Sequence, residues 1–226
     1  MTRAARSGAD AGVPDCDEHR ITVASARRIL AGRRARPATK LARYLGTFGG
    51  RHFSPAVAVT APTRITGTVV AALRYLNASV PLAFRPRLLT TTRRQISALL
   101  GRIPRTTDLS VVTPAQYRGV LGRTSSTWHL WCLLGTILNG ARRSGRWVTT
   151  SKLLHAKRPR LLPILDSRVK CHLRLRPSGQ WEAIWCAVRD PVVQATLLTL
   201  RSNVLGATAL SLLRIFDIVV WMQGPC

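Results

Sequence analysis

Carboxylates are scarce in this sequence. Its 226 residues include nine Asp and Glu against 35 Lys and Arg, for a formal net charge of +26. Many cations therefore have no carboxylate to pair with, which is typical of proteins that bind nucleic acid or another polyanion. Lysine is scarce too, at positions 40, 152, 157 and 170 alone. A GC-rich genome also favours Arg over Lys, so that preference by itself indicates no function.

Metal-binding and redox motifs are also missing. The five cysteines, at positions 16, 132, 171, 186 and 226, form no C-x-x-C pair, and neither H-x-x-x-H nor H-E-x-x-H occurs. The sequence thus predicts no zinc site, no catalytic metal and no cofactor. An odd cysteine count signals no disulfide framework. We expect reduced thiols, with Cys132, Cys171 and Cys186 as small core residues and Cys16 and Cys226 closer to the surface.

No uninterrupted apolar run is long enough to span a bilayer. The most apolar stretch, residues 204–221, contains Arg214 and Asp217, and charged groups are costly at the bilayer centre. The first twenty residues lack the apolar region of a secretory signal. We therefore expect a cytoplasmic protein without a membrane partner, and a buried core helix at the C-terminal end.

Helical periodicity dominates the sequence, and convincing strand alternation is rare. Thr66 is placed to cap a helix that reaches about residue 77, and Thr113 precedes a proline at a helix start. Residues 126–139 carry apolar side chains three and four apart and stop at a glycine. The prediction is an all-α fold: a single compact multi-helix domain over residues 21–226, preceded by a disordered tail over residues 1–20.

Two acids stand out because each lies in an apolar run. Asp166 precedes Ser167 and Arg168, so it is either a helix N-cap or a functional carboxylate. Asp217 follows Arg214 by three residues, a spacing that favours an intrahelical ion pair. We expect Asp217, Arg168 and Arg214 to form structural ion pairs, and Asp166 to be the candidate catalytic residue.

Basic residues gather on both sides of one predicted helix, over residues 151–155. A nucleic-acid-binding face is expected from these segments, with Trp147 as the aromatic most suited to stack on a base. The residues predicted to bind nucleic acid are Arg142, Arg143, Arg146, Trp147, Lys152, Lys157, Arg158 and Arg160.

The stretch TTSKLLHAKRPRLLPILDSRV, residues 149–169, resembles the signature of an uncharacterised bacterial family (DUF6308). That family carries the pattern VTAxKLLxxKRPxLxPxxDxxV. The resemblance extends to Trp128 and Trp131 and to residues 211–222, and covers about residues 44–222. It implies a family and no established activity.

A more distant similarity is to helix-hairpin-helix DNA glycosylases, which place a glycine-rich hairpin ahead of a catalytic aspartate. Thr150 and Asp166 lie 16 residues apart, close to the spacing in that family. The similarity implies that Asp166 is the carboxylate and Gly145 the first hairpin glycine. However, Trp147 stands at the second glycine and Thr149 at the nucleophilic lysine of the bifunctional members, so lyase chemistry is not implied.

Three functions follow as hypotheses. The first is a helical protein that binds nucleic acid, DNA more readily than RNA, through its phosphates. The second is a nucleic-acid-processing enzyme, glycosylase-like, that uses Asp166. The third is a non-catalytic helical protein with an unknown partner, whose arginine content reflects composition alone.

Overall fold

The computed structural model describes residues 14–32, 36–139 and 147–226. Over these residues the fold is all-α, as predicted: the chain forms helices and turns and no strand. The α-helices are α1 (Arg20–Leu30), α2 (Pro37–Thr47), α3 (Phe53–Ala58), α4 (Gly67–Ala72), α5 (Arg93–Arg102), α6 (Pro114–Leu121), α7 (Ser126–Asn139), α8 (Trp147–Lys157), α9 (Ser167–His172), α10 (Gln180–Arg189), α11 (Pro191–Asn203) and α12 (Leu212–Trp221).

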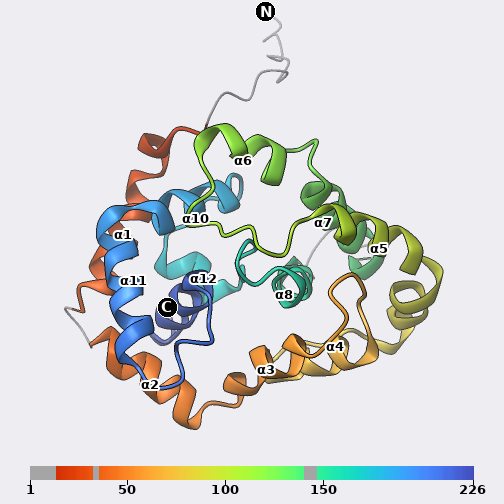
Figure 1. Ribbon diagram of the computed structural model, residues 1–226, viewed down its shortest axis with the longest axis horizontal. Helices are drawn as coiled ribbons and strands as arrows, with labels where there is room; N and C mark the ends of the chain where they lie inside the picture. Colours follow the sequence, from red (N-terminus) through yellow and green to blue (C-terminus); the bar gives the residue numbers. More distant parts are fainter. Residues whose placement is uncertain (1–13, 33–35, 140–146) are drawn as a thin grey trace, which may run out of the picture.

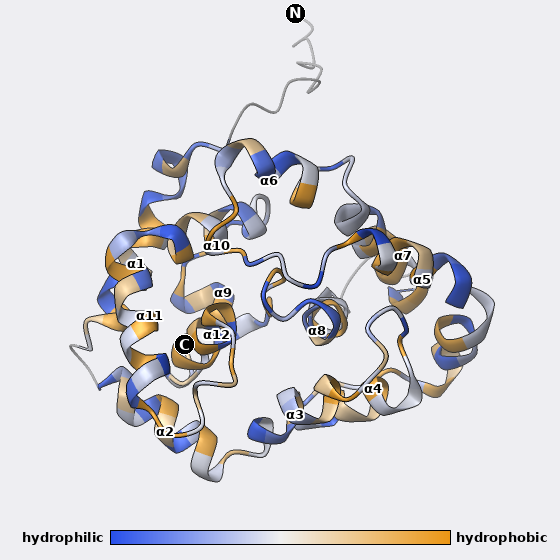
Figure 2. Ribbon diagram, in the orientation of Figure 1, coloured by the Kyte–Doolittle hydropathy of each residue, from blue (hydrophilic) through white to orange (hydrophobic). Residues whose placement is uncertain are grey.

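Helices α8, α9 and α12 occupy the middle of the molecule and the other helices surround them (Figure 1; α9 is labelled in Figure 2). Helix α12 packs against α2, α9 and α11, whereas α8 packs against α3, α4 and α7. The short connection between α8 and α9 therefore crosses the centre of the domain.

Local sequence signals explain several helix starts. The Thr66 hydroxyl accepts a hydrogen bond from the Val69 amide, and Thr113 and Gln116 form a reciprocal capping box at α6. Asn77 ends the short 3₁₀ segment Leu73–Leu76 in the left-handed conformation, at φ 52°. These boundaries agree with the sequence prediction because each depends on neighbouring residues alone.

Hydrophobic residues concentrate on α12, which is buried along almost its whole length (Figure 2). This confirms the expected buried helix, although it begins at Leu212 and is shorter than the apolar run. Arg214 and Asp217 are only 4% and 2% exposed. In the described part of the chain, no helix has both the length and the apolarity needed to cross a membrane.

The cysteines depart from the sequence prediction. Cys16 is bonded to Cys186, and Cys171 to Cys226, across 170 and 55 residues respectively. Cys132, expected in the core, is exposed and free. The expectation of reduced thiols is thus wrong for four of the five cysteines in this structure, because the fold brings together residues whose spacing gave no sign of pairing.

Helical structure begins earlier than the expected tail over residues 1–20 allowed. Residues 1–13 lie outside the described residues, but the segment Cys16–His19 is a 3₁₀ helix and α1 begins at Arg20. Asp15 caps this segment by accepting a hydrogen bond from the Asp17 amide. Residues 14–20 are therefore part of the fold.

Candidate functional site

The segment between α8 and α9 lacks regular structure, so its backbone groups need partners from elsewhere. Ser151 on α8 accepts a hydrogen bond from the Leu165 amide at 3.1 Å. Asp217 on α12 accepts one from the Ile164 amide at 3.2 Å. Both contacts are buried, and they fix the end of the segment that leads into Asp166.

Asp166 is the N-cap of α9. One carboxylate oxygen, Oδ1, accepts a hydrogen bond from the Val169 amide at 3.0 Å, so the helix-cap interpretation of this residue holds. The other oxygen makes no hydrogen bond to the described residues. Asp166 is 9% exposed and lines a cavity, so a cap role leaves one oxygen available to a ligand.

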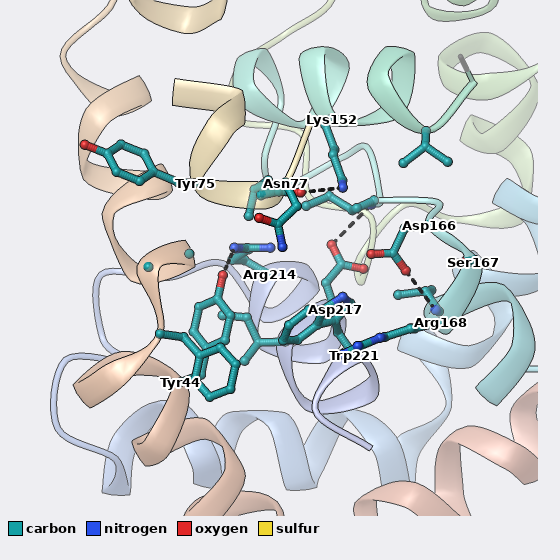
Figure 3. Close-up of a pocket in the computed structure, with 18 of the residues that line it drawn as sticks. Tyr44, Tyr75, Asn77, Lys152, Asp166, Ser167, Arg168, Arg214, Asp217 and Trp221 are labelled. Atoms are coloured by element: carbon teal, nitrogen blue, oxygen red, sulfur yellow. Dashed lines mark hydrogen bonds between the residues drawn. The ribbon is translucent and has the colours of Figure 1, made fainter. Parts of the chain in front are cut away.

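The cavity has a volume of about 480 Å³. Its walls come from α2 and the turn after it, the 3₁₀ segment Leu73–Leu76, α8, α9 and α12 (Figure 3). Four basic side chains line it: Arg74, Lys152, Arg168 and Arg214. Four aromatic residues also line it: Tyr44, Phe48, Tyr75 and Trp221. The Tyr75 ring, however, points away from the other labelled side chains (Figure 3) and lies against His52. The carboxyl groups among its described lining residues are those of Asp166 and Asp217.

Lys152 lies on the α8 wall of this cavity. Its ammonium group donates a hydrogen bond to the Leu76 carbonyl at 2.7 Å, and the residue is 6% exposed. Burial lowers the pKa of Lys152, while the negative charge of Asp166 opposes that effect and the positive charge of Arg214 adds to it. The two sequence-predicted residues Lys152 and Asp166 are thus brought to one site.

Arg214 is held against the opposite wall by Tyr44. Its guanidinium group donates to the Tyr44 hydroxyl at 2.7 Å, whereas its Nε has no partner among the described residues. The Tyr44 hydroxyl in turn packs closely against Gly50, where a Cβ atom would collide with it. Gly50 is therefore needed for close approach of the ring, a role that its glycine-rich surroundings did not reveal.

Asp217 is buried and does not form the close ion pair expected with Arg214. Burial is the main cause that raises the pKa of Asp217 to about 8, and the charge of Asp166 raises it further. Arg214 and the Ile164 amide act in the opposite direction. Tertiary packing gives Arg214 and Asp217 separate partners, so their helical spacing alone was misleading.

Arg168 makes a different contact from the predicted one. Its guanidinium carbon lies 4.6 Å from the centroid of the Trp221 ring, a cation–π geometry at the edge of the cavity. No salt bridge joins it to Asp217 in the described structure. Arg168 and Trp221 together form a flat, positively charged wall.

Lys157 and Arg158 do not belong to an exposed basic face. The Lys157 ammonium donates to Thr60 Oγ1 and to the Ala61 carbonyl at 2.9 and 3.0 Å. Burial, with smaller effects from the Arg158 and Arg105 charges, lowers the pKa of Lys157 to about 8. Lys157 and Arg158 are both buried, so their charges are used within the fold.

Arg158 is 2% exposed and connects three parts of the chain by hydrogen bonds. Its guanidinium donates to the carbonyls of Leu100, Ile103, Pro62 and Lys157. Leu100 lies in the last turn of α5, where free carbonyls attract a cation. The Lys-Arg pair is therefore a structural feature.

The remaining predicted residues are dispersed. Arg160 is about half exposed and pairs with Asp108 at 3.1 Å. Trp147 starts α8 and stacks on Trp131, with ring centroids 5.0 Å apart, so its ring faces another side chain. The predicted contacts of Arg142, Arg143 and Arg146 lie outside the described residues. Sequence reasoning missed Tyr44 and Arg74, which carried no local motif, and gave no role to Trp221, although it lies in the family-like stretch 211–222.

Metal binding has no support in the described chain. No group of three or more His, Cys, Asp or Glu side chains there is arranged to hold an ion. The cavity instead offers basic side chains, aromatic residues and two carboxyl groups, those of Asp166 and Asp217, each with one oxygen that has no hydrogen-bond partner among the described residues.

Comparison with known proteins places the chain beside a family of unknown function. Residues 37–224 match the model of a family of unknown function, DUF6308. No curated protein and no solved structure matches the chain. The likeness to helix-hairpin-helix glycosylases therefore gains no support, and the predicted hairpin glycine, Gly145, lies outside the described residues.

Proposed function

The chain belongs to the DUF6308 family, whose function is unknown, and we propose that it binds nucleic acid, with one nucleotide unit entering the cavity beside Asp166. The observation that carries this proposal is the composition of the cavity wall. Four basic side chains line the cavity together with two carboxyl groups, and burial raises the pKa of one of these, that of Asp217, to about 8. An anionic ligand is favoured electrostatically in such a site.

The aromatic rings narrow the class of ligand. Arg168 already stacks on Trp221, and the Trp221 ring packs edge-on against Phe48, which also lines the cavity. Flat rings next to guanidinium groups suit a base with an attached phosphate, since stacking and phosphate pairing then act together. The ligand we propose is a nucleotide unit of DNA in preference to RNA.

The unpaired arginines support the same class of partner. Among the described residues, only Arg27 and Arg160 form a salt bridge with a carboxylate. Other arginines, including Arg93 and Arg94 on α5, are exposed. Such cations can neutralise phosphates and release counterions, which gives sequence-independent affinity.

The test is fluorescence anisotropy with a labelled single-stranded DNA of twenty nucleotides at two salt concentrations, repeated with RNA. Affinity should fall steeply with salt. The Arg74→Gln/Arg168→Gln variant should bind about ten-fold more weakly, because it loses both phosphate and stacking contacts. Absence of binding at low salt would overturn the proposal.

A control variant distinguishes binding in the cavity from a general effect of positive charge. Arg93→Gln/Arg94→Gln removes the same charge from exposed positions that do not line the cavity. This control should flatten the salt dependence slightly and leave most of the affinity. Equal losses in both variants would argue for a diffuse charge effect and against the cavity.

A second candidate is an enzyme that acts on nucleic acid through Asp166. It is favoured by the free carboxylate oxygen of Asp166, which lines the cavity together with the Lys152 side chain. A carboxylate in that place can stabilise developing positive charge or accept a proton from water. Incubation of labelled DNA with the protein should then yield products that Asp166→Asn abolishes.

A further inference from the structure

A second cavity, with a volume of about 380 Å³, is lined by α3, the end of α8 and the turn after it, and the start of α12. Five basic side chains line it: Arg105, Lys157, Arg160, Arg201 and Arg214. Asp108 is the one carboxylate among its described lining residues, and it is paired with Arg160.

Two of these basic side chains have no hydrogen-bonding or ion-pair partner among the described residues. Arg105 and Arg201 make no hydrogen bond or salt bridge with the described residues, although Arg105 is near enough to Lys157 and Arg158 to repel their charges. Crowded cations without counterions destabilise one another. An anion bound beside Arg105 would reduce that repulsion.

Two buried nitrogens without partners mark the wall of this cavity. Nδ1 of His155 lies 2.6 Å from the Leu162 carbonyl, so it carries the proton, and Nε2 presents a lone pair. Nε2 has no partner among the described residues, and neither has Nε of Arg214, which can only donate. His155 and Arg214 are 1% and 4% exposed and both line the cavity. Unsatisfied buried polar atoms are rare and require an explanation.

The start of α12 adds to the attraction for anions. Ser211 caps this helix by accepting a hydrogen bond from the Arg214 amide, and Leu210 and Ser211 line the cavity. The first turn of a ten-residue helix presents free amides and the positive end of its dipole.

We propose that this second cavity binds a phosphate group that carries a hydroxyl proton, as part of a small phosphorylated molecule. Arg105, Arg201 and the Nε of Arg214 neutralise the oxygens, and the hydroxyl donates to Nε2 of His155. Charge alone selects any anion, whereas the lone pair on His155 selects one with an O–H donor. The proposal does not depend on nucleic-acid binding at the first cavity.

The experiment is isothermal titration calorimetry of the full chain with inorganic phosphate and, separately, with sulfate at the same ionic strength. Phosphate has an O–H group near neutral pH and sulfate has none. Phosphate should bind about ten-fold or more tightly than sulfate, because a buried acceptor left unpaired is costly. Equal affinities, or no phosphate binding at low ionic strength, would overturn the proposal.

Three double variants test whether phosphate binds in the second cavity. Arg105→Gln/Arg201→Gln should weaken phosphate binding by about ten-fold or more, while Arg93→Gln/Arg94→Gln, with the same charge change, should leave it intact. Arg74→Gln/Arg168→Gln should also leave it intact, which separates this site from the nucleotide cavity. Loss of phosphate binding in the α5 control as well would reject a defined site.

Competition identifies the source of the phosphate. If a single-stranded oligonucleotide does not displace inorganic phosphate, the ligand is a free phosphorylated molecule, as proposed. If displacement occurs and is lost in Arg105→Gln/Arg201→Gln, the cavity holds a phosphate of a nucleic-acid strand, and the small-molecule assignment is wrong.

Discussion

Asp217 Oδ2 lies 3.8 Å from His155 Nδ1, yet the two groups do not form an ion pair over most of the pH range. Burial and the Arg214 charge lower the pKa of His155 to about 3, and burial raises that of Asp217 to about 8. Between these values both side chains are neutral. Their interaction is therefore that of two buried polar groups, one bonded to the Leu162 carbonyl and the other to the Ile164 amide.

The raised pKa of Asp217 predicts that the stability of the fold depends on pH. An unfolded Asp titrates near pH ~4, so a folded pKa of about 8 means that folding takes up a proton. The stabilising effect of this proton is complete below pH ~4 and is lost as the pH rises towards 8. Asp217→Asn should remove this loss and raise the melting temperature relative to the unchanged protein at pH 8.

Thermal denaturation from pH 5 to pH 9 measures this effect. The difference between Asp217→Asn and the unchanged chain should grow with pH, on the order of a few kcal/mol at its largest. His155 titrates in both proteins, so it cancels in the difference. A difference that stays flat with pH would show that Asp217 is ionised in the fold.

Arg158 and Arg160 form a matched pair for testing the structural role of the basic turn. Arg158→Ala leaves the buried carbonyls of Leu100, Ile103 and Pro62 without their donor and should cost about 3 kcal/mol or more. Arg160→Ala breaks only a half-exposed pair with Asp108 and should cost about 1 kcal/mol or less. Urea denaturation measures the free energy of unfolding of both variants. Similar losses would contradict a structural role for the Arg158 hydrogen bonds.

The disulfides predict how the protein responds to reductant. The Cys16–Cys186 bond closes a long loop, so its removal should lower stability by about 2–5 kcal/mol. Without reductant, thiol titration should find one reactive group per chain, that of Cys132. Mass spectrometry of a non-reduced digest should recover the Cys16–Cys186 and Cys171–Cys226 peptides, and five free thiols would contradict both bonds.

Two substitutions of Asp166 distinguish its role as a helix cap from a role in ligand binding. Asn is as good an N-cap as Asp, so Asp166→Asn should leave the melting temperature nearly unchanged, whereas Asp166→Ala should cost about 1 kcal/mol. Any activity that requires the carboxylate should be lost in both variants. If Asp166→Asn retained activity and Asp166→Ala lost only stability, the residue would be a cap alone.

Short-range signals accounted for much of the local structure. Thr66, Thr113 and Asp166 cap helices as their neighbours in sequence predicted, because a cap involves residues only two or three positions apart. The same reasoning from local spacing predicted an ion pair between Asp217 and Arg214. That prediction did not hold, since a buried carboxyl group is governed by whichever backbone amide the fold presents to it.

Composition and periodicity alone determined the helical class, the shortage of carboxylates and the prominence of Asp166 and Asp217. Tertiary structure decided which cations are free. It buried Lys157 and Arg158 against backbone carbonyls, paired cysteines far apart in sequence, and set Tyr44 against Arg214 across 170 positions. The physical reason is that burial and pairing depend on distances in space, and local sequence patterns do not reveal which distant carbonyls, rings or thiols will meet.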